Sequence, residues 1–175
     1  MAAHYNGIIG FIWKKVSHFD YDKYWKMREY VISHQKGIKT LYYLYRVKKT
    51  DAFHNASLGL HLGFNSAKFA SRPYLPHGLN GIIVSNDAII GKNCQLYHQV
   101  TIGGGKNGSP IIGDNVLIGA GAKIIGHVKI GNNVKIGAGC VVAVDVPDNA
   151  TVVMNKPRII IHKDSHESIT DKCHI

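Results

Sequence analysis

The chain has 175 residues, of which 45% are hydrophobic, and its 21 basic against 11 acidic side chains give a formal net charge of +10. This length favours one domain with at most a small appendage, and no stretch holds the ~18 apolar residues that a membrane-spanning helix needs. A basic surface favours an anionic ligand, an anionic polymer or a membrane face. Nucleic acid is not an expected partner, because the basic residues form no dense run and are not interleaved with aromatic ones.

The cysteines and the N-terminal sequence bear on the compartment. Cys94, Cys140 and Cys173 have no paired spacing, which argues against a disulfide framework and for a reducing compartment. The apolar run at residues 7–13 is short, and no small-residue cleavage site follows it, so it does not resemble a signal peptide. We therefore expect a cytoplasmic protein, whose basic N-terminal segment leaves a peripheral membrane contact open.

Residues 1–55 are predicted to form a helical segment. Apolar and aromatic residues keep helical spacing from Tyr21 to Ile32, and Asp20 stands where an N-cap is expected. Gly37 interrupts the pattern, which resumes from Ile38 to Tyr45. Because the open end of a stacked repeat must be shielded from water, we interpret these helices as a cap. A basic amphipathic helix that contacts a membrane or polymer is the alternative.

The middle of the chain repeats with a period of six residues. The repeating aliphatic positions are Val84, Ile90, Leu96, Ile102, Ile112, Ile118, Ile124, Ile130, Ile136 and Val142. No helix has this period, and a short fixed period marks a solenoid. Each hexad predicts one short strand and one turn, so that three hexads form a triangular coil. The fold class is therefore mainly β, with a parallel β-helix that we place at residues 56–161.

The repeat is interrupted once, between Ile102 and Ile112, where four extra residues make a glycine-rich stretch at 103–110. An insertion between two coil strands must leave the coil as a loop, and such loops often form the binding face of a solenoid. After the repeat, Lys156 and Arg158 place two charges near its end. Residues 162–175 are polar and are predicted to be a frayed tail.

Five stretches in this order resemble the hexapeptide-repeat acyltransferases, and most of all their serine O-acetyltransferase branch: PHGLNGIIV, VTIGGGKNG, IGAGAKI, KIGAGCVV and NKPRII. The resemblance covers about residues 58–161. It implies a left-handed parallel β-helix, a homotrimer, and acetyl-CoA bound as co-substrate between neighbouring subunits, with no metal. The left-handed sense comes from the resemblance alone, because general rules predict right-handed crossovers.

The resemblance also assigns residues to the reaction. His77 matches the family's catalytic histidine, which would take the proton of the acceptor hydroxyl as that oxygen attacks the thioester carbon. Backbone N–H groups of the loop that holds Gly104 and Gly105 are candidates to bind the oxyanion. Ala120 and Ala138 are expected to stack along the pantetheine arm, since they are one coil apart. Lys156 and Arg158 are expected to meet the phosphates of the coenzyme.

Two departures from the family pattern bear on the acceptor. Pro76 stands where the family has an aspartate that orients the catalytic histidine, so the group that orients His77 is not named by the sequence. The loop is also short, and it lacks the arginine and histidine that hold serine in that family, which leaves a carboxylate without its charge partner. Both departures resemble the enzymes that acetylate sugar hydroxyls in capsule or exopolysaccharide synthesis. We take this as the main hypothesis, with weaker candidates for sugar contacts at Tyr74, Asn80, Tyr97 and His98.

Three alternatives remain open. The first is a serine O-acetyltransferase of cysteine biosynthesis with a rearranged pocket. The second is a γ-class carbonic anhydrase, whose fold is the same and whose zinc is held by three histidines. His77, His98 and His127 could be compared with those ligands, but the family's close histidine pair is absent. The third is a non-catalytic scaffold.

Overall fold

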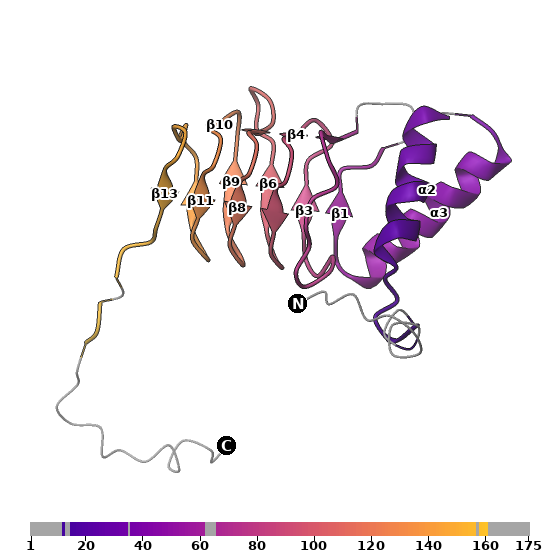
Figure 1. The fold of residues 1–175 in the computed structure, drawn as a ribbon, viewed down its shortest axis with the longest axis horizontal. Helices are drawn as coiled ribbons and strands as arrows, with labels where there is room; N and C mark the ends of the chain where they lie inside the picture. Colours follow the sequence, from indigo (N-terminus) through magenta and orange to yellow (C-terminus); the bar gives the residue numbers. More distant parts are fainter. Residues whose placement is uncertain (1–11, 13–14, 35, 62–65, 157, 161–175) are drawn as a thin grey trace, which may run out of the picture.

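The computed structural model describes residues 12, 15–34, 36–61, 66–156 and 158–160. They form a triangular coil of short parallel strands with two helices at its N-terminal end (Figure 1). Sheet A contains β1 (Ser57–Leu58), β3 (Ile83–Val84), β6 (Thr101–Gly103), β9 (Lys123–Ile125) and β12 (Val141–Val142). Sheet B contains β2 (Lys68–Phe69), β4 (Ile89–Ile90), β7 (Ile111–Ile112) and β10 (Lys129–Ile130). Sheet C contains β5 (Gln95–Leu96), β8 (Leu117–Ile118), β11 (Lys135–Ile136) and β13 (Thr151–Val152).

This arrangement confirms the left-handed parallel β-helix. Ile83 pairs with Thr101, one coil and 18 residues later, whereas Ile89 pairs with Ile111, 22 residues later, because the 103–110 loop lies between their coils. The repeating aliphatic residues point inward and are almost completely buried: Ile90, Leu96, Ile102, Ile118, Ile124 and Ile136 are each 0% exposed. Regular packing begins with β1, so the stretch before Val84 already belongs to the coil although its hexad pattern is poor.

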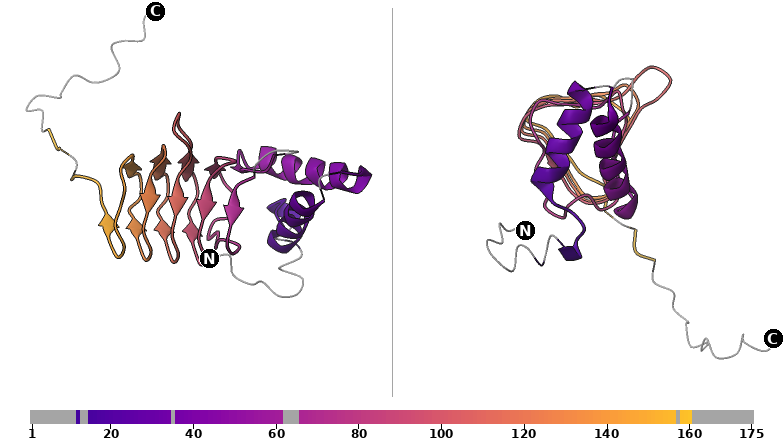
Figure 2. Two further views of the ribbon diagram at one scale, coloured as in Figure 1. Left: turned by 90° about the horizontal axis from the view of Figure 1, so that it is seen from above. Right: turned by 90° about the vertical axis from the view of Figure 1, so that its right-hand side faces the viewer.

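The predicted helices are confirmed as α2 (Tyr21–Ser33) and α3 (Ile38–Phe53), and the Asp20 side chain caps α2 by accepting a hydrogen bond from the Lys23 N–H at 3.2 Å. They lie across the open end of the first coil (Figure 2). The buried Arg28 guanidinium donates to the carbonyl oxygens of Leu58 and Ala67, at 3.1 and 2.7 Å. The α2 helix thus satisfies backbone groups that the first coil would otherwise leave unpaired, as a cap must.

The face of α3 that packs inward differs from the one that the sequence pattern outlines. Thr40, Val47 and Asp51 are the buried residues of this helix. The aliphatic and aromatic residues that carried its helical spacing point outward: Ile38, Leu41, Tyr42 and Tyr45 are 88%, 58%, 52% and 59% exposed. The reason is that the inward face is held by polar contacts. The Tyr24 hydroxyl donates to Asp51 Oδ1 at 2.7 Å, and the Thr40 hydroxyl donates to the His34 carbonyl oxygen at 2.7 Å.

The buried Asp51 carboxyl gives a pH-dependent contribution to stability. Burial raises the pKa of Asp51 from 3.8 to about 6, against opposing effects of the Tyr24 hydrogen bond, Lys48 and Arg28. Between these two values the folded chain binds a proton that the unfolded chain has released, so the contribution of Asp51 to stability falls as pH rises from about 4 to about 6.

Asp51→Asn should therefore gain stability relative to the wild type over this pH range, because it keeps an oxygen acceptor for Tyr24 and carries no charge. At 1.36 kcal/mol per pH unit, the free energy of unfolding of the variant minus that of the wild type should rise by up to about 3 kcal/mol from pH 4 to pH 7. Urea unfolding of both proteins at each pH measures this difference, with the exposed Asp87→Asn as the control for loss of one negative charge. A difference that stays constant from pH 4 to pH 7 would contradict the assignment.

None of the helices in the described part of the chain is long and apolar enough to cross a membrane. The predicted polar tail, residues 162–175, lies outside the described residues.

Candidate active site

The site is built on the corner of the coil where sheet C turns into sheet A. There the carbonyl oxygens of His54, Asn80, His98 and Ala120 each accept the backbone N–H of the next coil, at 2.8–3.0 Å. Five residues are thereby stacked in one line, which we call the corner column: His54, Asn80, His98, Ala120 and Ala138. Each is followed by a residue with φ between 49° and 70°. The left-handed conformation recurs in every coil and keeps the column in register.

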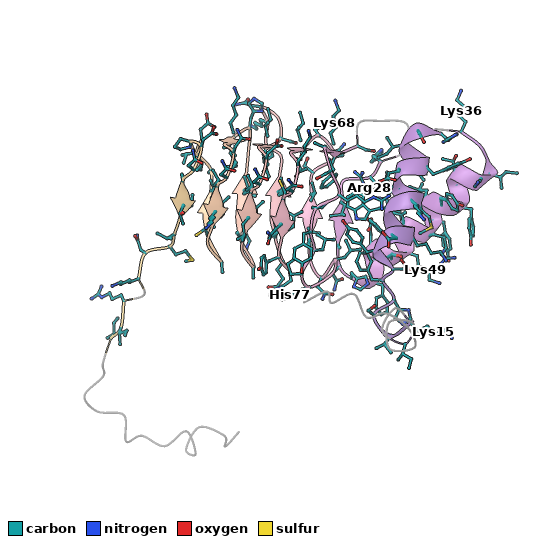
Figure 3. All side chains as sticks on the ribbon, in the orientation of Figure 1. Lys15, Arg28, Lys36, Lys49, Lys68 and His77 are labelled. Atoms are coloured by element: carbon teal, nitrogen blue, oxygen red, sulfur yellow. The ribbon has the colours of Figure 1, made fainter. Side chains whose placement is uncertain are left out.

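His77 lies beside the wide, polar end of this column. It stands on the turn that follows the exposed Tyr74, just before β3, and its side chain is exposed. The turn is closed by a hydrogen bond from the Gly78 N–H to the Leu75 carbonyl oxygen, with Gly78 at φ 68°. The Asn80 side-chain amide donates to the His77 carbonyl oxygen at 3.0 Å. These bonds fix the backbone that presents His77 on the lower edge of the coil, next to the helices (Figure 3).

The ring of His77 is held by His98. The two Nδ1 atoms are 2.6 Å apart, so one nitrogen donates a proton and the other accepts it. The Tyr97 ring meets the His77 ring edge to face, with centroids 5.5 Å apart. His98 was predicted only as a weak sugar contact, yet its imidazole lies where the family's aspartate would be needed as an orienting group. The question that Pro76 left open is therefore answered by a histidine from the next coil.

His77 and His98 line an open cleft of about 520 Å³. The cleft is completed by the end of α3 and by the column: Phe53, His54, Asn55, Asn80, Gly81 and Gln99. Asn80 links the two halves, because its Oδ1 lies 3.2 Å from His54 Nδ1. Sequence reasoning missed Phe53, His54, Asn55 and Gln99. The 18-residue step from Asn80 to His98 could have shown that these two stack, but the contact from α3 follows no repeat.

The corner column narrows to two alanines as it leaves His77. Ala120 and Ala138 stack as predicted, since the Gly139 N–H donates to the Ala120 carbonyl oxygen at 2.8 Å. Beyond Ala138 the chain returns at Met154, whose Sδ would lie 3.0 Å from a Cβ placed on Gly139. Lys156 and Arg158 are exposed in the segment that follows. With about 4.8 Å between coils, the column from His98 to Ala138 spans roughly 10 Å, and Lys156 lies past its far end.

The glycine loop lies at a different corner from His77. It connects β6 of sheet A to β7 of sheet B, whereas His77 precedes β3 at the other end of the sheet A strands. The exposed Gly104 and Gly105 therefore do not approach the His77 ring of the same chain. Gly105 and Gly108 exchange two backbone hydrogen bonds, 2.8 and 3.2 Å long, which carry the Lys106 and Asn107 side chains out on a narrow hairpin. A Cβ on Gly104 would lie 2.7 Å from Ser109 Oγ, so the base of the loop is closely packed.

His127 also belongs to that other corner, since its Nδ1 would lie 2.8 Å from a Cβ placed on Gly108. It is thus separated from His77 and His98, and the three-histidine comparison finds no support within one chain. Over the described ranges, no three His, Cys, Asp or Glu side chains are grouped so that they could hold a metal ion.

Comparisons with known proteins agree with this coil. The family model for the bacterial transferase hexapeptide (six repeats) matches residues 109–143. The chain belongs to the hexapeptide-repeat family. Serine acetyltransferase 5 of Arabidopsis thaliana is 46% identical over 112 residues, which cover 62% of this chain and 36% of the plant enzyme. A serine acetyltransferase of Staphylococcus aureus is 42% identical over 91 residues, 50% of this chain and 42% of that enzyme.

Solved structures give the same relationship. Neisseria gonorrhoeae serine acetyltransferase in complex with serine matches with a TM-score of 0.61 and 33% identity, over 77% of this chain and 54% of that one. Isoform 3 of the Entamoeba histolytica enzyme, in complex with cysteine, matches with a TM-score of 0.64 and 27% identity, over 79% and 49%. The hexapeptide-repeat chain thus matches less than two thirds of the length of these relatives.

Proposed function

We propose that this hexapeptide-repeat protein is an O-acetyltransferase of the serine acetyltransferase type, which moves an acetyl group from acetyl-CoA to a hydroxyl. One observation carries the proposal: an exposed imidazole, held by a second histidine, stands at the head of a column of stacked residues that narrows to alanines and ends beside cations. Small side chains leave room for an extended arm, and cations suit its phosphates. The similarity of this coil to serine acetyltransferases supports the same activity.

His77 would act as the general base. For this it needs an unprotonated Nε2, which requires that its Nδ1 carries the proton and donates it to His98 Nδ1. His98 is then a positioning residue that selects the tautomer. His77 would receive the proton of the acceptor hydroxyl while that oxygen attacks the thioester carbon. It would return the proton to the departing thiolate when the C–S bond breaks, so that the imidazole ends the cycle neutral.

We further propose that the site is shared between subunits of a homotrimer. The glycine loop and His77 lie at opposite ends of the sheet A strands, so a neighbouring coil is needed to bring a loop against the His77 cleft. The backbone N–H groups of Gly104 and Gly105 would then face the oxyanion of the other subunit's reaction. If so, an inactive His77 variant mixed and refolded with an inactive loop-deletion variant should regain activity. Continued inactivity of assembled mixtures would count against a shared site.

Serine is the first acceptor to test, because the relatives are named for it. The cleft around His77 holds no Lys or Arg among its lining residues, so a carboxylate would need a cation from elsewhere. Lys106, the charged residue of the 103–110 loop, is the one that a neighbouring loop would bring. A Lys106→Ala variant should therefore raise the KM for serine if serine is the substrate.

The second candidate acceptor is a sugar hydroxyl, which the absence of a cation among the cleft residues favours. A neutral acceptor needs no charge partner, and Tyr74, Tyr97 and the Asn80 amide offer hydrogen-bonding groups near His77. This reading of capsule or exopolysaccharide synthesis has no support from the relatives.

The experiment is a thiol-release assay with acetyl-CoA against L-serine and a panel of uncharged sugars. Release that depends on serine and is weakened by Lys106→Ala supports the first acceptor. Release with sugars that ignores Lys106→Ala supports the second. No acceptor-dependent release with any hydroxyl compound would overturn the proposed function and favour a non-catalytic scaffold.

A further inference from the structure

The outward face of α3 is an apolar stripe with nothing packed on it. Ile38, Leu41, Tyr42, Tyr45 and Phe53 follow one side of the helix and are 52% to 88% exposed. They lie opposite Thr40, Val47 and Asp51, the residues that face the cap interior. A helix of a globular protein normally turns its apolar side inward. Here the inward side is held by Tyr24 and polar contacts, which leaves an apolar stripe for another surface.

Basic side chains flank this stripe along its whole length. They are Lys36, Lys39, Arg46, Lys48 and Lys49. No acidic residue lies between Lys36 and Thr50, and Asp51 at the end of the helix is buried. Lys36 and Lys49 mark the two ends of this region in Figure 3. An exposed helix with large apolar residues on one side and cations beside them has the composition of helices that lie in a membrane interface.

We propose that this stripe docks α3 flat on an anionic lipid surface. Ile38, Leu41 and Phe53 would enter the boundary of the acyl chains, while Tyr42 and Tyr45 would place their rings at the level of the headgroups. The five cations would meet anionic headgroups. A second copy of the chain is a poorer occupant, because two such stripes would bring ten positive charges together without an acidic partner between Lys36 and Thr50.

The stripe ends at the candidate active site. Phe53 belongs to the stripe and also lines the His77 cleft, and its ring lies 5.2 Å from that of His54. Docking therefore places the cleft mouth beside the lipid surface. The placement does not depend on which acceptor the enzyme uses, because it follows from the course of α3 alone.

The test is co-sedimentation of the full chain with vesicles of phosphatidylcholine alone and of equal parts phosphatidylcholine and phosphatidylglycerol. Binding should require the anionic lipid. A charge variant, Lys48→Glu with Lys49→Glu, should weaken binding at least about tenfold. An apolar variant, Ile38→Ser with Leu41→Ser, should weaken it by a similar factor without changing binding to dextran sulfate, a soluble polyanion. Both pairs are exposed, so the thermal unfolding transition should stay unchanged.

The matched control carries Ile89→Ser and Lys129→Glu on sheet B, which also removes one exposed apolar residue and one cation. It should bind vesicles like the wild type. The proposal is overturned if the chain binds neither vesicle or binds both equally. It is also overturned if only the charge variant loses binding, since the patch would then be a general polyanion site. Loss of a self-associated form on Ile38→Ser with Leu41→Ser, without any lipid binding, would mean that a second copy covers the stripe.

Discussion

His77→Ala should lower kcat for acetyl transfer by roughly 10²–10⁴-fold, the usual contribution of a positioned general base. The affinity for acetyl-CoA should change little, because the imidazole is expected to contact the acceptor hydroxyl rather than the pantetheine arm. The side chain is exposed, so its removal leaves no cavity in the coil and the variant should unfold at the wild-type temperature. Thiol release under saturating acetyl-CoA measures kcat, and calorimetric titration with CoA measures the affinity.

His98 variants separate positioning from proton transfer. His98→Ala removes the partner of His77 Nδ1 and should lower kcat by roughly 10–10²-fold, because the ring is then free to adopt the wrong tautomer. His98→Gln offers an amide at the same place and should restore part of the rate. A merely structural role of His98 would alter the unfolding temperature but would not produce this order of rates. If His98→Ala were inactive while His77→Ala kept more than about a third of kcat, the base would be His98.

The coil was predictable because its core follows one rule. Each inward position is aliphatic, each coil takes 18 residues, and the single insertion between Ile102 and Ile112 shows as a break in the count. Stacking of Ala120 on Ala138 follows from the same number. The outline of the cap was predictable as well, since Asp20 and Gly37 mark helix ends by local chemistry.

The features that sequence could not supply depend on contacts without a period. The face that α3 buries is decided by the hydrogen bond between Tyr24 and Asp51, which pairs two helices across a gap in sequence. The partner of His77 depends on a side-chain orientation at a corner rather than on strand register. The separation of Gly104 from His77 was missed for a different reason. The motifs of a shared site lie close in the family's assembly, whereas one chain presents only its two halves.

Separation of the two ends of the corner column allows the coenzyme path to be tested by itself. Ala138 is exposed, and its Cβ points from the corner that continues from His98 through Ala120. Ala138→Leu would place an isobutyl group where an extended pantetheine arm is proposed to lie. The KM for acetyl-CoA should then rise by roughly 10–10²-fold, since the displaced thioester would no longer meet the acceptor in line. The KM for the acceptor should change much less, because His77, Asn80 and His98 are untouched.

The matched control for this prediction is Ala143→Leu, which enlarges an exposed alanine of the same coil at the corner between sheets A and B. It should leave both KM values unchanged. Direct binding of CoA to Ala138→Leu and to Ala120→Leu, measured by calorimetry without any acceptor, distinguishes a blocked path from a slower chemical step. If Ala138→Leu binds CoA as tightly as the wild type and keeps its KM for acetyl-CoA, the arm does not follow the corner column. Lys156 and Arg158 would then lose their proposed role, because only an arm that runs along Ala120 and Ala138 brings phosphates to that end of the coil.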